Sequence, residues 1–182
     1  QTVPACPDQE SYRQKIAELE AEMVGDEPFF SWGFHASWHG DMSRKVLDAI
    51  STTRPMVVWH RSFHEVYLNS AMLELLEITQ EGVGARQQID FERGHFYEVG
   101  LGYAIQKLNR FIMSDEWILK GLDRLKQIVH LGGHTTVGDL AVGLFDYELE
   151  RALSVSVLDQ ANVPFRVLGV PHAGSASCPL YR

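Results

Sequence analysis

Apolar and polar residues alternate along the chain in patterns that predict short strands separated by helices. Within residues 11–24 the apolar positions recur at helical spacing between charged residues, which is typical of an amphipathic helix. The apolar runs 29–34 and 56–59 are bounded by turn residues and predict strands. Further helices are predicted over 43–50, 69–77, 101–111, 114–131 and 147–161, further strands over 135–137 and 165–170, a surface loop at 82–84, and irregular or extended chain over 89–99. Strands that alternate with helices predict βαβ units and a parallel sheet, hence the α/β class.

A dense set of polar side chains follows the apolar run Met56-Val57-Val58-Trp59. The next residues are His60, Arg61, Ser62 and His64, and a helix begins near Asn69. In α/β folds the carboxyl end of a buried strand is where substrates are bound, so we expect the functional site here. The alternative is a polar loop whose side chains pack against one another.

A second polar stretch runs from Phe91 to Glu98. Glu98 follows two aromatic residues, which predicts partial desolvation of its carboxylate and a raised pKa unless a cation or metal compensates. A solvent-facing Glu98 on a loop is the alternative.

Composition changes this interpretation little. The chain has 182 residues, 45% hydrophobic and 22% charged, as expected for a single globular segment spanning residues 1–182. The formal net charge of −8 argues against a nucleic-acid partner, and no apolar run approaches the ~18 residues that span a membrane. Cys6 and Cys178 have no zinc-binding spacing, so a reducing, cytoplasmic setting is expected.

Three histidine pairs have the spacing of metal ligands on a helix: His35/His39, His60/His64 and His130/His134. None contains the glutamate of an HExxH motif, and each lies at a loop, a strand end or a glycine pair, so we do not expect a metal site from any of them. Ser62 lies beside two histidines but outside a GxSxG motif, which leaves a serine hydrolase as a weaker hypothesis.

Two segments resemble a known family. Gly133–Asp139 (GHTTVGD) is similar to the G-x-T-T-V-x-D strand of the amidohydrolase superfamily. The stretch from Trp59 to Leu73 resembles the H-x-S-x-H…NS-A-L motif of its family 3 branch, which includes N-substituted formamide deformylases. Residues 54–58 and 94–98 are similar to further parts of that branch, and the likeness extends from about Trp32 to Val170.

The resemblance implies a (β/α)8 TIM-type barrel that binds one or two divalent metals, usually zinc. A metal-bound water would attack a carbon–nitrogen bond of a small amide-type substrate. It implies that His64 and His60 are catalytic, with His64 orienting the substrate carbonyl, and that Arg61 and Asn69 face the substrate, Asn69 also capping the following helix. Glu98 is the candidate metal ligand, in place of the carboxylated lysine that other branches use.

The chain lacks the H-x-H motif of the first barrel strand, and a barrel needs about 250 residues. We therefore expect a partial barrel from the middle of a metal-dependent hydrolase. Alone it should be inactive and bind no metal, and it should form homo-oligomers or associate with the rest of the parent chain. The alternative is a stand-alone α/β binding module without a metal site.

Overall fold

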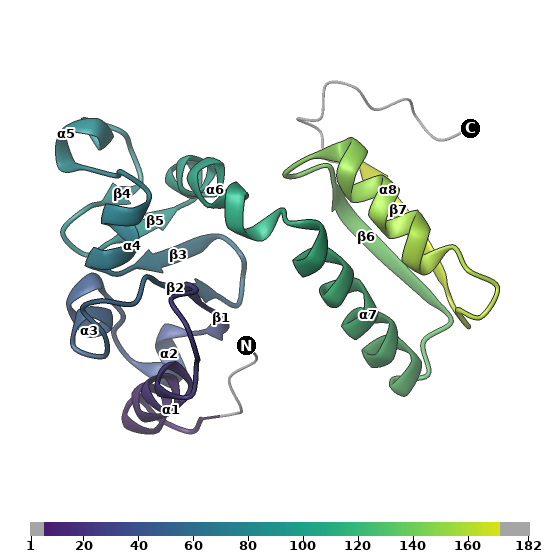
Figure 1. Cartoon of the computed structure of the whole chain (residues 1–182), viewed down its shortest axis with the longest axis horizontal. Coiled ribbons are helices and arrows are strands. Elements are labelled where there is room, and N and C mark those ends of the chain that lie inside the picture. The colour runs from purple at the N-terminus through teal and green to yellow at the C-terminus, as the bar shows by residue number, and fades with distance from the viewer. Residues whose placement is uncertain (1–5, 172–182) are drawn as a thin grey trace. The chain divides into compact units, whose positions relative to one another are not determined.

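The computed structural model describes residues 6–171, which divide into two compact units, 6–107 and 108–171 (Figure 1). Unit 1 is built on a mixed five-stranded sheet, and unit 2 on a two-stranded parallel sheet. Cys178 lies outside the described residues. No described helix has the length and apolar character needed to cross a membrane.

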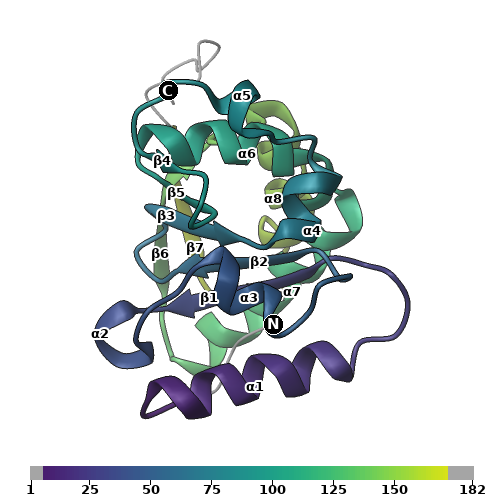
Figure 2. The same ribbon diagram turned by 90° about the vertical axis from the view of Figure 1, so that its left-hand side faces the viewer.

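The strands of unit 1 lie in the order β1-β2-β3-β5-β4, which can be followed in Figure 2. The elements along the chain are α1 Gln9–Ala21, β1 Phe29–Phe34, α2 Ala36–His39, α3 Arg44–Asp48, β2 Met56–His60, β3 Glu65–Leu68, α4 Ser70–Leu75, α5 Gln80–Val83, β4 Ile89–Asp90, β5 His95–Tyr97 and α6 Val99–Ile112. Helix α6 continues beyond residue 107, where the two units divide.

The expectation of parallel strands throughout was wrong for unit 1. Strands β1 and β2 are parallel, but β2–β3, β3–β5 and β4–β5 are all antiparallel. Only residues 61–64 separate β2 from β3, and a parallel crossover needs a dozen or more residues, so the chain must return as a hairpin. Strand β3 therefore lies within the polar stretch between β2 and the helix that begins near Asn69. Residues 82–84, predicted to be a surface loop, include the end of α5.

The core of unit 1 lies between the sheet and helices α1 and α3. Tyr12 and Ile16 of α1 are fully buried against Phe29, Met56 and neighbouring strand residues. Asp8 caps the start of α1, and its side chain accepts the Ser11 backbone N–H in a reciprocal capping box. Packing of this kind fixes the five-stranded sheet against its helices.

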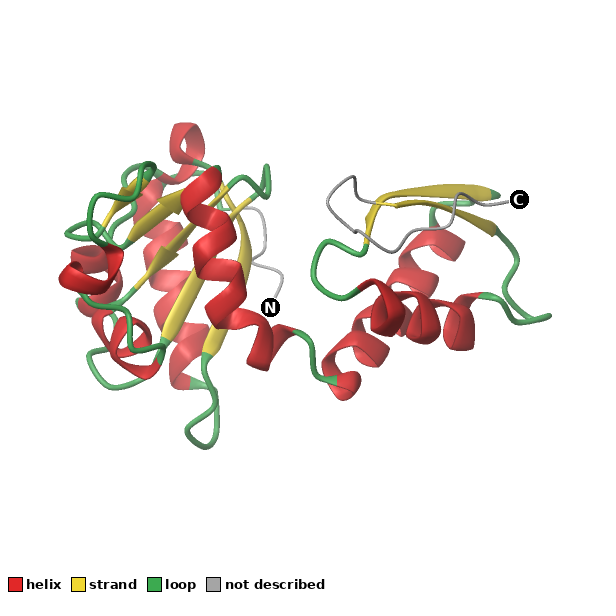
Figure 3. Ribbon diagram, turned by 90° about the horizontal axis from the view of Figure 1, so that it is seen from above, coloured by secondary structure: helices red, strands yellow, loops and turns green. Residues whose placement is uncertain are grey.

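Unit 2 is a βαβ unit with one further helix. Its elements are α7 Asp115–Leu131, β6 Thr136–Val142, α8 Tyr147–Leu158 and β7 Arg166–Pro171. The strands pair in parallel, as predicted, and both helices cover the same side of them (Figure 3). Val129, Leu158 and Phe165 form its buried cluster. The α/β class is thus confirmed, and no closed barrel occurs among residues 6–171.

Candidate functional site

Polar side chains gather at the end of the unit 1 sheet where β1, β2 and β5 finish and β3 begins. His60 ends β2, and Glu65 begins β3 after a turn in which Phe63 has a positive φ of 67°. The antiparallel pairing of β3 with β5 places Glu65 opposite Tyr97, so Glu98 follows at the same end. Four of the five residues predicted for the site, His60, Arg61, His64 and Glu98, therefore lie at this end of the sheet.

Glu65 is the centre of a partly buried network at this end of the sheet. One carboxylate oxygen, Oε2, accepts hydrogen bonds from His95 Nε2 at 2.6 Å and from the Tyr67 hydroxyl at 3.1 Å. The other, Oε1, lies 3.7 Å from His60 Nδ1. The Tyr67 and His95 rings stack with their centroids 4.3 Å apart. Burial, and secondarily the Glu65 carboxylate, raises the pKa of Tyr67, so its hydroxyl stays protonated and donates.

The protonation of His60 follows from its hydrogen bonds. Its Nδ1 accepts the backbone N–H of Ser62 at 3.1 Å and contacts the Ser62 hydroxyl at 2.7 Å. A nitrogen that accepts a backbone N–H carries no proton, so the ring is neutral with its proton on Nε2. Burial lowers the pKa of His60, and this effect exceeds the opposing influence of Glu65.

This geometry does not form a Ser–His–acid triad. Ser62 Oγ and Glu65 Oε1 both approach Nδ1 of His60, whereas a triad places the serine and the acid on opposite ring nitrogens. The serine hydrolase hypothesis loses its geometric basis.

His64 and Glu98 form an exposed pair held at two points. His64 Nδ1 lies 3.2 Å from Glu98 Oε2, and the Glu98 backbone N–H donates to the His64 carbonyl at 2.9 Å. Glu98 has a φ of 47°, a left-handed conformation that is uncommon for glutamate and that clusters at functional positions. The Ser62 hydroxyl accepts the His64 backbone N–H at 3.2 Å and so joins this pair to His60.

Asn69 lies apart from this cluster, and its side chain is fully buried. Its Oδ1 accepts the N–H groups of Met56 and Met72, each at 2.9 Å, and its Nδ2 donates to the carbonyls of Ser51 and Arg54. The predicted capping of α4 is confirmed. The predicted contact of Asn69 with substrate stays a prediction, and all four hydrogen-bonding positions of its amide already have backbone partners.

Sequence reasoning missed Glu65, Tyr67 and His95. Glu65 and Tyr67 are two residues apart and so share one face of a strand, a period-2 signal that was present in Glu65-Val66-Tyr67-Leu68. The partner His95 carries no local signal, because only the β3–β5 pairing brings it 30 positions back to Glu65.

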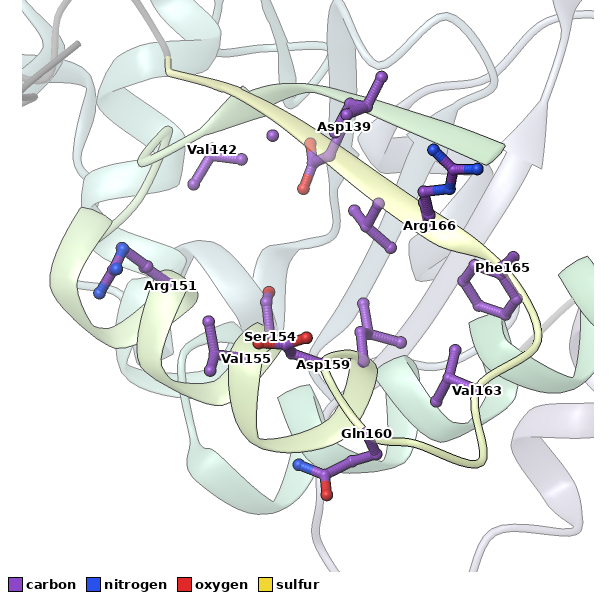
Figure 4. Close-up of a pocket in the computed structure, with 14 residues that line it drawn as sticks. Asp139, Val142, Arg151, Ser154, Val155, Asp159, Gln160, Val163, Phe165 and Arg166 are labelled. Carbon is purple, nitrogen blue, oxygen red and sulfur yellow. The ribbon is translucent and has the colours of Figure 1, made fainter. Parts of the chain in front are cut away.

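Unit 2 contains a pocket of about 540 Å³ between α8 and the two strands (Figure 4). Apolar residues such as Val155, Leu158 and Phe165 line it, together with the charged side chains of Asp139 and Arg166. Its lining also includes Arg151 and Asp159, but it contains no histidine, unlike the polar cluster of unit 1. We therefore place the candidate site at the unit 1 sheet end.

A metal centre needs several ligand side chains close together. Within residues 6–171 no group of three or more His, Cys, Asp or Glu side chains is arranged to hold a metal ion. Glu98 is paired with His64, and Nδ1 of His60 is occupied by Ser62. A zinc site needs three or four protein ligands, so the described residues do not fit a complete metal centre.

The fold is shared with two solved structures. An uncharacterized metal-dependent hydrolase from Pyrococcus horikoshii OT3 matches 92% of this chain with a TM-score of 0.62 and 20% identity. An uncharacterized metal-dependent hydrolase from Pyrococcus furiosus matches 93% with a TM-score of 0.60 and 18% identity. The chain spans about a third of the length of either, 32% and 33% respectively. No family model and no curated protein matches the chain.

Proposed function

We propose that this chain is a segment of a metal-dependent hydrolase that cleaves a carbon–nitrogen bond in a small amide-type substrate. The fold that it shares over more than nine-tenths of its length with two metal-dependent hydrolases carries the proposal. The carbon–nitrogen bond as the target, and a partial (β/α)8 barrel as the architecture of the parent, rest on the motif resemblance of residues 59–73 and 133–139 to amidohydrolases.

In this proposal His64 orients the substrate carbonyl and Glu98 orients His64. The carboxylate of Glu98 takes the Nδ1 side of the imidazole, and no hydrogen bond within residues 6–171 occupies Nε2, which would face the substrate. A carbonyl oxygen accepts a hydrogen bond, so this role requires a proton on Nε2 of His64. The hydrogen bond from the Glu98 backbone N–H to the His64 carbonyl keeps the two residues side by side.

The metal, which we propose to be zinc, would supply an activated water. Its ligand set would come chiefly from parts of the parent outside residues 6–171, with Glu98 as a contributor or as a group that orients a ligand. The chain alone would then hold no stoichiometric zinc and hydrolyse no amide.

The test compares the isolated chain with the full-length product of its reading frame. Elemental analysis and an amide hydrolysis assay should find zinc and turnover in the full-length protein, with neither in the 182-residue chain. Tightly bound zinc in the isolated chain, or full-length turnover that survives complete metal removal, would contradict the proposal.

Two substitutions in the full-length protein separate the proposed roles. His64→Ala should lower kcat/KM by about 2–4 kcal/mol of transition-state stabilisation with zinc content unchanged. Glu98→Gln should lower zinc content together with turnover if Glu98 is a ligand, and turnover alone if it only orients His64. His130→Ala and Glu92→Gln, at exposed positions outside the site, are matched controls and should leave both quantities unchanged.

The second candidate function is a binding module without catalysis. The incomplete ligand set of the described residues favours it over a complete enzyme for this chain by itself. A full-length protein without metal and without turnover would establish it in place of the hydrolase.

A further inference from the structure

Residues 35–39, which contain the short helix α2, follow the end of β1 (Figure 2). Only His39 of this segment is buried, with 7% of its surface exposed, whereas residues 36–38 are all exposed. The His39 ring stacks on the ring of Tyr12 in α1 with the centroids 4.1 Å apart, and it lies 5.9 Å from the ring of Phe34. One buried imidazole therefore anchors the segment to the core of unit 1.

The hydrogen bonds of His39 require a neutral ring. Its Nδ1 accepts the backbone N–H of His35 at 3.1 Å, so this nitrogen carries no proton. The ring proton is therefore on Nε2, and the ring donates to the backbone carbonyl of Cys6, which precedes α1. The neutral imidazole thus joins the start of the segment to the chain that leads into α1.

A second proton on His39 would have no acceptor in this position. An Nδ1–H would oppose the His35 N–H, donor against donor. The titratable groups that face the ring are His35 at the start of α2, Tyr12 of α1 and Cys6, and none of them is a carboxylate. Burial, and secondarily His35, lowers the pKa of His39, so the packed ring resists protonation.

The charged side chains that follow these groups in the sequence are already engaged. Arg13 of α1 donates from Nη2 to the Asp41 carbonyl at 3.2 Å, and the Asp41 carboxylate pairs with Arg93. No carboxylate of the described residues forms an ion pair with His39. Proton uptake therefore favours a state in which this ring has left the core.

The same segment supports two polar side chains of the candidate site. The His35 ring stacks on the Trp38 ring with the centroids 4.5 Å apart, and it lies 5.1 Å from the His60 ring. The Arg61 guanidinium lies over the Trp38 ring, 4.7 Å from its centroid. Displacement of the segment would therefore remove the ring contacts that position His60 and Arg61.

We propose that residues 35–39 form a pH-sensitive clamp, which holds His60 and Arg61 in place while His39 is neutral and releases them once His39 is protonated. The clamp itself stands on the geometry of unit 1, and it rests on the proposed function only for the assignment of His60 and Arg61 to a substrate site. A released His39 has the ordinary histidine pKa of about 6.5. The released fraction should therefore rise below about pH 6.5, by up to about tenfold per pH unit.

Amide hydrogen exchange of the ¹⁵N-labelled 182-residue chain, followed by NMR between about pH 7.5 and 5.0, tests the clamp. The His35 amide donates to His39, and the Trp38 amide donates to the His35 carbonyl within the segment. Their protection factors, corrected for the intrinsic exchange rate, should fall together below about pH 6.5, by up to about tenfold per pH unit. The Leu68 amide, which donates to the Gly94 carbonyl, should stay at least about a hundredfold more protected, because the clamp opens without unfolding the sheet.

Matched histidine variants assign the effect to one ring. In His39→Asn the side-chain oxygen can accept the His35 N–H but cannot titrate, so the two segment amides should keep their protection as the pH falls. His130→Asn, at an exposed position in unit 2, should retain the pH dependence of the wild type. In the full-length enzyme, KM should rise below about pH 6.5 in the wild type and less in His39→Asn.

Protection of the His35 amide that is independent of pH, or that depends on pH equally in His39→Asn, would overturn the clamp. Equal protection of the His35 and Leu68 amides in the wild type would also overturn it, because the segment would then open only by unfolding of unit 1, and this comparison needs no variant. Exchange requires neither metal nor turnover, so its failure is separable from failure of the hydrolase proposal. Identical KM profiles in the wild type and His39→Asn would overturn the link between the clamp and the substrate site.

Discussion

Asn69→Ala should be among the most destabilising substitutions in unit 1. The side chain is fully buried and joins three segments: the turn before β2, the start of β2 and the first turn of α4. Alanine would remove the helix cap, worth about 1 kcal/mol. It would also leave buried N–H and carbonyl groups unpaired, at about 1–3 kcal/mol for each that water cannot reach. We expect a loss of about 3–5 kcal/mol in the free energy of unfolding.

Urea unfolding followed by tryptophan fluorescence measures this loss. Trp32, Trp38 and Trp59 lie in unit 1 and Trp117 in unit 2, so a Trp117→Phe background makes the signal report on unit 1. In that background the thermal midpoint of unit 1 should fall by about 12 °C or more.

Two further variants separate the cap from the rest of the network. Asn69→Asp keeps a good cap acceptor but turns a carboxylate oxygen toward the carbonyls of Ser51 and Arg54, so it should also be strongly destabilising. Thr79→Ala removes an exposed cap with a single bond, to Gly82, and should cost only about 1 kcal/mol. The four hydrogen bonds of Asn69 do not explain its effect if Asn69→Ala lowers the free energy of unfolding no more than Thr79→Ala does. The same holds if Asn69→Asp is as stable as the wild type.

Three other substitutions have directions set by the structure. Gly94 has a φ of 61°, and a Cβ there would collide with the Leu68 carbonyl, so Gly94→Ala should destabilise unit 1 by about 2 kcal/mol or more. Gly102 lies in a helix with open space around it, so Gly102→Ala should stabilise by about 0.5–1 kcal/mol in the same urea assay. Burial, and secondarily His35, lowers the pKa of His39, so the unfolded chain takes up a proton first as pH falls. The free energy of unfolding should therefore be highest above about pH 6.5 and decline below it, by at most about 1.4 kcal/mol per pH unit for this group. His39→Asn should flatten this decline between about pH 7.5 and 5.5.

Local signals in the sequence predicted most elements of unit 1. Strand β1 has the predicted bounds, Phe29–Phe34, because an apolar run between turn residues leaves few alternatives. Ser43 precedes α3 and Asn69 caps α4, where the capping preferences place them. Strands β4 and β5 have two and three residues, too few to show a period, so only their pairing defines them.

Four of the five residues predicted for the site lie at one end of the sheet, but their contacts were not predicted. His60, Arg61 and His64 were recognised because polar residues directly after a buried run are conspicuous in the sequence. Their partners were not, since Glu65–His95 and His64–Glu98 are contacts across 30 and 34 positions that depend on the order of strands β2, β3 and β5. Sheet order is a long-range property, and a hydrophobic pattern specifies only which face each strand buries.

The turn at residues 61–64 joins β2 to β3 as an antiparallel hairpin, where a parallel connection was expected. It also positions the polar side chains at this end of the sheet. A crossover helix after β2 would have carried the chain away from His60. The tight return instead places the Ser62 N–H on His60 Nδ1 and begins β3 at Glu65, within reach of His95. Arg61 belongs to the same turn, and its exposed guanidinium lies over the ring of Trp38. Lengthening this turn should therefore release the fixed tautomer of His60 and the position of Arg61 together, because one short backbone segment determines both.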